Sequence, residues 1–228
     1  MTAERLDVYY GTQLIGCLFD TDPLTFQYSD AWVRSREAFA LPGIPLAPGP
    51  VATEAVAAMF DNLLPEGALR EYIGKQKHAS TAFALLREVA GDTAGALSIV
   101  EAGSGLGAPA YEKLGWADLA ALLAGKKTAA AIDLNVADAR ISLAGAQDKV
   151  LIAIDRKGNP MLPRGESPST HILKPDIRRL PKVHHSAVNE TITMLTAAKA
   201  GLQTAEVSYQ PDTAACIVKR FDRIEFDG

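Results

Sequence analysis

The chain has 228 residues, of which 48% are hydrophobic and 22% are charged, and its formal net charge is −4. This length accommodates one large domain or two small ones, and the composition is typical of a soluble globular protein. The acidic balance argues against a surface that coats nucleic acids in general, although it leaves room for a local basic patch.

The sequence shows no disulfide framework, metal motif or membrane segment. Cys17 and Cys216 are far apart, so we expect free buried thiols rather than a disulfide, and no metal-ligand spacing is present. Residues 1–7 carry charges and contain no apolar core segment, so we expect no secretory signal. No run of 18 apolar residues is present, so we expect no membrane span and a protein of the reducing cytoplasm.

The first hundred residues predict an antiparallel meander followed by helices. Residues 6–10 and 13–19 predict a hairpin across Gly11-Thr12, and the alternation in residues 24–28 predicts a third strand. The proline-rich residues 41–50 exclude a helix and predict either an ordered irregular crossing or a flexible loop. Helices are predicted over 53–62 and 80–90, with Leu63-Leu64 in the same core and a strand over 94–100.

A glycine-rich stretch, residues 103–109, is the clearest break in composition. Three of its first five residues are glycine, but their spacing differs from the dinucleotide-binding fingerprint and no matching acidic residue follows. We interpret the stretch as a linker and place a subdomain boundary nearby. A short amphipathic helix is predicted over residues 116–124, with its end at Gly125.

The second half predicts a small sheet with one long helix. Residues 140–154 predict a strand, a tight turn and a second strand, and a turn at 155–160 and a strand at 170–174 follow. A helix is predicted over 186–200, and residues 207–209 and 215–219 predict two more strands. We expect the apolar face of the helix to consist of Val188, Ile192, Leu195 and Ala198, with Glu190 on its flank.

Three features of this half together favour phosphate binding. They are a small-residue loop before Lys149, a lysine on a later strand (Lys174), and an acidic residue in the following helix (Glu190). Backbone N–H groups and a lysine ammonium neutralise phosphate oxygens, and a helix carboxylate holds such a lysine in place. The alternative is an ordinary hairpin with a surface ion pair worth under about 1 kcal/mol.

The order of several motifs resembles that of the HipA family, serine/threonine protein kinases known as toxins of bacterial toxin–antitoxin pairs. In the second half the likeness lies in Ser142-Leu143-Ala144-Gly145-Ala146-Gln147-Asp148-Lys149, His171-Ile172-Leu173-Lys174, Asn189-Glu190 and Arg220-Phe221-Asp222-Arg223. In the first half it lies in Phe60-Asp61-Asn62-Leu63-Leu64-Pro65 and Gly95-Ala96-Leu97. The resemblance therefore covers nearly the whole chain.

The resemblance implies an ATP site whose residues are spread over the second half. They are Gly145, Ala146, Gln147 and Lys149 at the triphosphate, Lys174 as the phosphate lysine with Glu190 as its partner, and Lys219, Arg220 and Phe221 on the adenine side. Ser142 corresponds to a residue that kinases of the family phosphorylate on themselves to switch off, and a plain turn serine is the alternative. Two positions depart from the family pattern, because Lys219 and Asp148 both stand where glutamate is frequent. Neither change forbids adenine binding, since backbone groups usually make that contact.

The implied fold class is α+β. Residues 1–102 would form a HipA-like N-terminal subdomain of antiparallel strands plus helices, and residues 103–139 a linker with a short helix. Residues 140–228 would form a protein-kinase-like N-lobe, a small antiparallel sheet with one helix. The helical C-lobe with the catalytic and Mg²⁺-binding aspartates follows this point in the family and is not found in the 228 residues. We therefore assign no catalytic or metal-binding residue here and expect the chain to be inactive alone, with ATP and Mg²⁺ used by the complete kinase and held by this chain weakly or not at all.

The resemblance also implies partners. They are a HipB-like helix-turn-helix antitoxin, DNA only through that antitoxin, and a protein substrate chosen by the missing lobe. Two alternatives remain open. One is a non-catalytic module that docks such an antitoxin or a separate kinase chain, and the other is an unrelated small-ligand binding protein that shares only local patterns.

Overall fold

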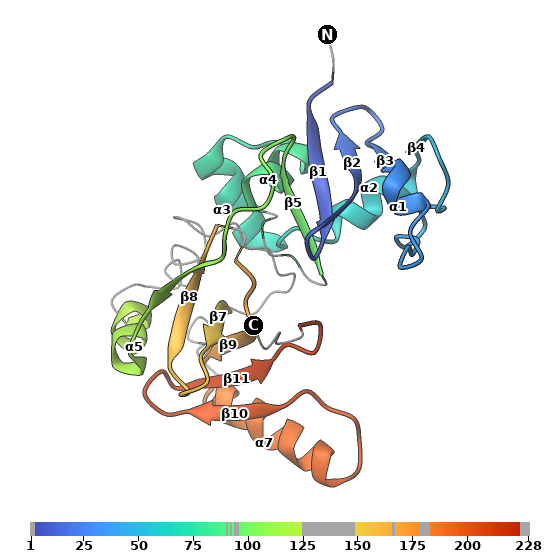
Figure 1. Cartoon of the computed structure of the whole chain (residues 1–228). Coiled ribbons are helices and arrows are strands. Elements are labelled where there is room, and N and C mark those ends of the chain that lie inside the picture. The colour runs from blue at the N-terminus through green and yellow to red at the C-terminus, as the bar shows by residue number, and fades with distance from the viewer. Residues whose placement is uncertain are drawn as a thin grey trace. The chain divides into compact units, whose positions relative to one another are not determined.

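The computed structural model describes residues 3–89, 91, 93, 96–124, 149–165, 167–177 and 183–223. The chain divides into two compact units, and the division falls between Ala108 and Pro109, inside the glycine-rich stretch. Each unit contains one sheet, and every strand pairing among the described residues is antiparallel (Figure 1).

The sheet of the first unit has five strands in the order β4-β3-β2-β1-β5. Its strands are β1 (Arg5–Tyr10), β2 (Gln13–Phe19), β3 (Thr25–Tyr28), β4 (Pro50–Ala52) and β5 (Leu97–Glu101). The predicted hairpin and third strand are confirmed, because β1 pairs with β2 and β2 with β3. Strand β4 is a short edge strand that the sequence analysis did not predict, since Pro50 opens it.

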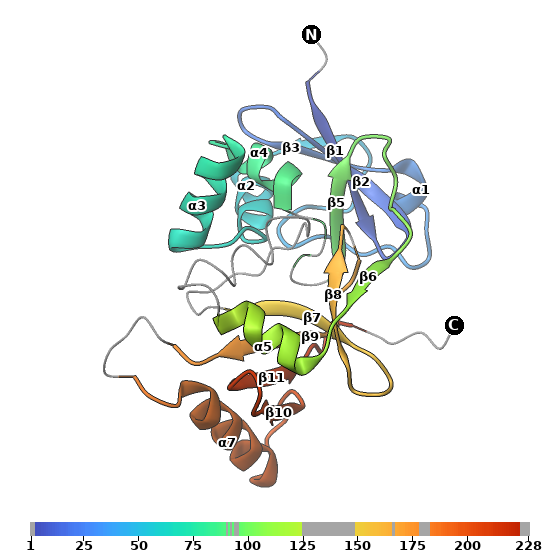
Figure 2. The same cartoon turned by 90° about the vertical axis from the view of Figure 1, so that its left-hand side faces the viewer.

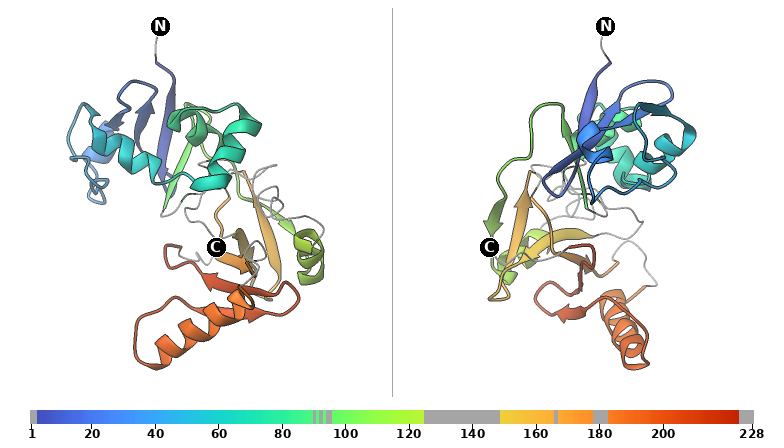
Figure 3. Two further views of the ribbon diagram at one scale, coloured as in Figure 1. Left: turned by 180° about the vertical axis from the view of Figure 1, so that it is seen from behind. Right: turned by 45° about the vertical axis from the view of Figure 1, so that its right-hand side comes forward.

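Four helices accompany this sheet, and α2 and α4 lie against one of its faces (Figure 3). They are α1 (Asp30–Val33), α2 (Glu54–Asp61), α3 (Gly67–Lys77) and α4 (Ala82–Val89). The core between the layers is aromatic, with Phe26, Tyr28 and Phe60 buried and their rings in edge or tilted contact. Leu63 and Leu64 are buried as predicted. Helix α3 was not predicted, because its apolar positions are few and Gly74 interrupts them.

The proline-rich segment 41–50 is an ordered crossing, so the flexible-loop alternative is wrong. Leu41 and Ile44 are buried, and the Tyr28 hydroxyl fixes both residues. The backbone N–H of Leu41 donates to that hydroxyl at 2.6 Å, and the hydroxyl donates to the Ile44 carbonyl at 3.1 Å. Burial raises the pKa of Tyr28, so the hydroxyl keeps the proton that it donates.

The sheet of the second unit has six strands in the order β10-β11-β9-β7-β8-β6. Its strands are β6 (Ala110–Lys113), β7 (Val150–Ile154), β8 (Pro160–Arg164), β9 (His171–Pro175), β10 (Val207–Gln210) and β11 (Ala215–Lys219). Helix α5 (Trp116–Ala124) covers one face through Leu119, which packs with Val150 and Leu173. The described part of residues 103–139, which the sequence analysis assigned to a linker, thus supplies β6 and α5 to the second unit.

Helix α7 (Ser186–Lys199) covers the other face of this sheet, alongside β10 and β11 (Figure 2). Side chains alternate between the two faces of a strand, so Leu173 belongs to the α5 side while Ile172 packs on the α7 side. Cys216 and Val218 of β11 also lie on the α7 side. Lys174 lies on the same face of β9 as Ile172, and its ammonium contacts α7.

The predicted apolar face of α7 is wrong. The residues that pack on the sheet are Ala187, Thr191 and Met194, whereas Ile192 is 58% exposed and Leu195 is 45% exposed. Helical periodicity identified an apolar stripe, but the small Ala187 and Thr191 allow the helix to approach the sheet closely on a neighbouring stripe. That rotation turns Glu190 toward the sheet.

Candidate functional site

An ion pair between β9 and α7 is the centre of the candidate site. The Lys174 ammonium lies 2.5 Å from Oε1 of Glu190, and the two side chains are 23% and 24% exposed. Lys174 is fixed by the pairing of β9 with β11 on one side and with β7 on the other, while Glu190 lies one turn into α7. The sequence analysis paired these residues from their order and type, and the structure brings them together.

The floor beneath this pair is small and mostly apolar. Cys216 lies opposite Lys174 on β11, and both Cys216 and Ala187 are buried. Burial raises the pKa of the Cys216 thiol, so at neutral pH it is protonated and acts as a small buried side chain. Thr191 donates from its hydroxyl to the Ala187 carbonyl at 2.8 Å. The ion pair therefore stands on a packed surface, and about a quarter of each side chain is exposed.

Helix α7 begins at a cap that the sequence analysis missed. Oδ1 of Asp176 accepts the backbone N–H of Ala187 at 2.9 Å, and Ser186 Oγ donates to the same oxygen at 3.3 Å. Asp176 follows Lys174 by two residues, and an acidic residue just after the lysine strand was the available signal. That Asp176 caps α7 could not be predicted from the sequence, because nine residues lie between Asp176 and Ser186.

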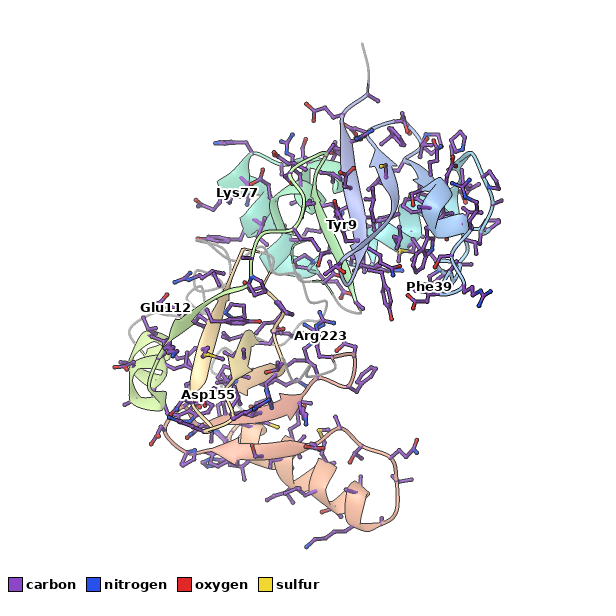
Figure 4. All side chains as sticks on the ribbon, viewed as in Figure 1. Tyr9, Phe39, Lys77, Glu112, Asp155 and Arg223 are labelled. Atoms are coloured by element: carbon purple, nitrogen blue, oxygen red, sulfur yellow. The ribbon has the colours of Figure 1, made fainter. Side chains whose placement is uncertain are left out.

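The segment that follows β11 is held by a network of charged side chains. The buried Arg220 guanidinium donates to both carboxylate oxygens of Asp222 at 3.0 and 2.7 Å and to Ser169 Oγ at 2.8 Å. Arg223, labelled in Figure 4, also donates to Asp222. Phe221 between them is 92% exposed. The buried Arg220 therefore fixes the conformation of the segment through its hydrogen bonds, while the Phe221 ring is exposed to solvent.

The remaining residues of the expected ATP site are only partly described. Ser142, Gly145, Ala146 and Gln147 lie outside the described residues. Lys149 immediately precedes β7 and is half-buried, and Lys219 at the end of β11 lies 3.7 Å from Glu206. The loop that would meet the phosphates is thus a prediction from the sequence.

The described part of the chain contains neither a metal site nor a membrane-spanning helix. Within it, no three His, Cys, Asp or Glu side chains gather closely enough to hold a metal ion. No described helix combines the length and the apolar character that crossing a membrane requires. Both cysteines are free thiols; Cys216 is buried as predicted, whereas Cys17 is only partly buried.

Comparison with protein families matches both halves of the chain. The family model for the HipA N-terminal domain matches residues 6–100, and the one for the HipA-like C-terminal domain matches residues 141–227. The first match lies within the first unit, and the second includes Lys174, Glu190 and the segment after β11.

Individual relatives agree with these matches. The chain is 33% identical to the putative kinase Y4mE of Sinorhizobium fredii, with 98% of this chain and 55% of the relative covered. It is 30% identical to the serine/threonine-protein kinase toxin HipA of Shewanella oneidensis, with 98% of this chain and 51% of the relative covered. The chain therefore spans about half the length of the curated relatives that it matches.

A solved structure shares the fold. It is the complex of the toxin–antitoxin system proteins HipA and HipB of Shewanella oneidensis with their operator DNA, matched with a TM-score of 0.74 and 28% identity over 98% of this chain and 52% of that one. Both halves of the chain, two curated relatives and this structure point the same way, and the protein belongs to the HipA family.

Proposed function

We propose that this chain is the N-terminal part of a HipA-like serine/threonine protein kinase toxin and carries the phosphate lysine and the ATP-phosphate loop. The observation that supports this most is the pair of Lys174 and Glu190 at 2.5 Å, with about three quarters of each side chain covered. A strand lysine held by a helix glutamate is the arrangement with which protein kinases grip nucleotide phosphates. Its residues come from segments that are similar to the family in sequence.

Each residue has a definite part in this proposal. Lys174 neutralises phosphate oxygens, and Glu190 keeps the ammonium in place. Gly145, Ala146 and Gln147 offer backbone N–H groups to the triphosphate, with Lys149 beside them. The backbone of Lys219 to Phe221 faces the adenine, and Ser142 is the candidate for autophosphorylation. ATP supplies the phosphoryl group, and Mg²⁺ neutralises its charge.

We further propose that this chain does not transfer phosphate by itself. Phosphoryl transfer needs an aspartate to orient the hydroxyl and acidic ligands for Mg²⁺. Asp222, the acidic residue nearest the proposed adenine side, is engaged with Arg220 and Arg223. We place the catalytic aspartates in the part of the relatives that this chain does not span.

Nucleotide titration tests the phosphate site. With tens of millimolar Mg-ATP, we expect the NMR signals of Lys174 and Glu190 to shift, and the shift of the Glu190 signal to disappear in Lys174→Ala. Lys157→Ala is the matched control, because Lys157 is exposed in the turn before β8. Calorimetry should show binding too weak for a micromolar Kd. Shifts that map elsewhere, or survive in Lys174→Ala, would refute the assignment.

A kinase assay tests the second part. The chain with Mg-ATP and a generic protein substrate should give no transfer above background. Phosphorylation of any substrate by the chain alone, lost in Lys174→Ala, would contradict the proposed inactivity.

We also propose a HipB-like helix-turn-helix antitoxin as partner. The support is the solved HipA structure, which contains HipB and operator DNA. Co-expression with a helix-turn-helix protein encoded beside this gene should yield a complex, and DNA should join only when that protein is present. If the complex forms but nucleotide leaves Lys174 unaffected, the alternative of a non-catalytic docking module is favoured. Failure of the two proteins to co-purify would contradict the partner assignment.

A further inference from the structure

We propose that Asp176 is a positioning residue, which holds α7 on β9 so that Glu190 meets Lys174. The inference deepens the proposed function and rests on it for its biological meaning, while its geometric content stands on the described residues alone. Lys174 and Asp176 are two residues apart at the end of β9, and both contact α7. Lys174 forms an ion pair with Glu190, and Asp176 accepts the backbone N–H of Ala187.

The first contact point is the start of α7. Asp176 Oδ1 accepts the Ala187 N–H at 2.9 Å and the Ser186 hydroxyl at 3.3 Å. Ser186 Oγ in turn accepts the backbone N–H of Ile177 at 2.8 Å. The chain leaving β9 and the first turn of α7 are therefore joined by reciprocal bonds, two of which use main-chain donors.

The helix has no cap of its own at this end. His185 occupies the N-cap position in a left-handed conformation with φ 55°, its side chain accepts no bond from the helix, and the first turn contains no acidic residue. Unpaired N–H groups at a helix start need an acceptor, and a negative charge there is favoured by the helix dipole. Asp176 supplies both from another element.

The second contact point is one turn further along the helix. Glu190 follows Ala187 by three residues, so the two lie on the same side of α7 and face β9 together. Ala187 and Thr191, the buried residues on either side of Glu190 along this face of the helix, leave little freedom for the helix to slide. Breaking the Asp176 cap leaves the Lys174–Glu190 pair as the only charged tie between this strand and this helix among the described residues, so the pair separates more often.

Lysine labelling measures that separation. Lys174 is acylated by a small amine-reactive reagent when its ammonium leaves Glu190, and mass spectrometry reports the rate at each lysine. We expect Asp176→Ala to raise the labelling rate of Lys174 about fivefold. The loss of a helix cap typically costs about 1 kcal/mol, which would shift the equilibrium toward the separated pair by about that factor. Amide hydrogen exchange in residues 187–191 should accelerate by a similar factor. Asp176→Asn, which retains an acceptor oxygen, should restore values close to those of the unaltered chain.

Matched controls separate positioning from general loosening. Asp118→Ala removes the carboxylate that accepts the Gly115 N–H at 2.9 Å at the start of α5 in the same unit, and it should leave Lys174 labelling unchanged. Labelling of Lys157 should not change in any variant. Lys157 is exposed, so it checks only that the reagent acts equally on all variants. If amide exchange in the buried strand β7 accelerates in Asp176→Ala as well, the variant has unfolded, and Ser186→Ala then provides the test with the same expected direction.

The positioning role of Asp176 and the phosphate role of Lys174 are tested by different outcomes. Unchanged labelling and exchange in Asp176→Ala and Ser186→Ala would overturn the positioning role. In the unaltered chain, Mg-ATP at tens of millimolar should protect Lys174 from labelling, and failure of that protection would overturn the phosphate role while leaving the positioning result in force.

Discussion

The two units differ in the make-up of their cores and in the burial of their bidentate ion pairs. The first unit places aromatic rings in its core, including Phe26, Tyr28 and Phe60, and its bidentate ion pair between Asp61 and Arg70 is substantially exposed. The core of the second unit is aliphatic, with Trp116 at its margin, and its ion pairs at Lys174 and Arg220 are partly or fully covered.

The burial of an ion pair indicates how strongly it constrains the position of its two residues. Covering a charge is costly unless a partner compensates it, so covered ion pairs mark places where position is constrained. An exposed pair contributes little and constrains little. In the second unit the covered pairs at Lys174 and Arg220 hold charged groups in fixed positions, as the proposed nucleotide site requires. The first unit also covers one charge, Asp7, which accepts the backbone N–H of Gly103 and lies 3.7 Å from Arg5.

The largest expected effect comes from Arg220. Arg220→Met should destabilise the second unit by about 3 kcal/mol, because it removes two hydrogen bonds from the largely covered Asp222 carboxylate and one from the Ser169 hydroxyl. The two tryptophans make the measurement specific, since Trp32 lies in the first unit and Trp116 in the second. Urea unfolding followed through Trp116 in Trp32→Phe should report the loss.

Lys219→Ala is the matched control for Arg220. Lys219 is adjacent and cationic, but its side chain is exposed, and its ammonium lies 3.7 Å from the exposed carboxylate of Glu206. We therefore expect Lys219→Ala to change the free energy of unfolding by no more than about 0.5 kcal/mol. Equal effects of the two substitutions would remove the contrast between covered and exposed charges in this unit.

Gly16 tests the packing of the first unit. A Cβ at this position would lie 2.5 Å from Cζ of Phe26 and 2.5 Å from the Gln27 carbonyl oxygen. Gly16→Ala should cost about 2 kcal/mol by overpacking, measured by urea unfolding through Trp32. Because part of the clash is with a ring, Gly16→Ala with Phe26→Leu should cost less than the two single changes added together. Strict additivity would show that the ring is not the obstacle.

The ion pair of the first unit should have a small, pH-dependent effect. Hydrogen bonds from Arg70 hold the pKa of Asp61 below its ordinary value of 3.8, so the pair stabilises the unit above that value and ceases to do so as the pH falls through the lowered pKa. Both side chains are substantially exposed, so Arg70→Ala should cost under about 1 kcal/mol at pH 7 and nothing at the lowest pH. NMR titration should show the Asp61 pKa rising in Arg70→Ala, and staying low in Lys75→Ala on the same helix.

The smallest effect is expected on the outer stripe of α7. Ile192→Ser should change stability by no more than about 0.5 kcal/mol, since Ile192 is exposed, whereas Met194→Ser should cost about 2 kcal/mol because Met194 packs on the sheet. Thermal unfolding followed through Trp116 separates the two. A larger cost at Ile192 would restore the helix face predicted from periodicity.

Patterns of short range were predictable. The hairpin of β1 and β2, the bounds of α2 and α5, and the strands β9 and β11 all follow from alternation, capping and proline placement. Helix α3 escaped because its apolar positions are sparse, and β4 and β6 because each is short and follows proline or glycine. These elements form because a neighbouring strand or helix offers them a surface.

The candidate site divides along the same line. The order and type of residues paired Lys174 with Glu190, but the helix face was predicted wrongly, because periodicity weighs apolar size and ignores how closely small residues let two layers approach. Asp176 and Ser186 were missed since their bonds cross a loop. The sequence also did not predict that the Arg220 guanidinium is buried against Asp222 and Ser169.

By itself, the sequence determined the family, the positions of most strands and helices, and which lysine and glutamate form the pair. Only the tertiary structure decided which side of α7 meets the sheet, what caps that helix, and which charges are covered. The physical reason is that local preferences depend on neighbours along the chain, whereas burial and hydrogen bonding between β9, α7 and β11 depend on residues that folding brings together.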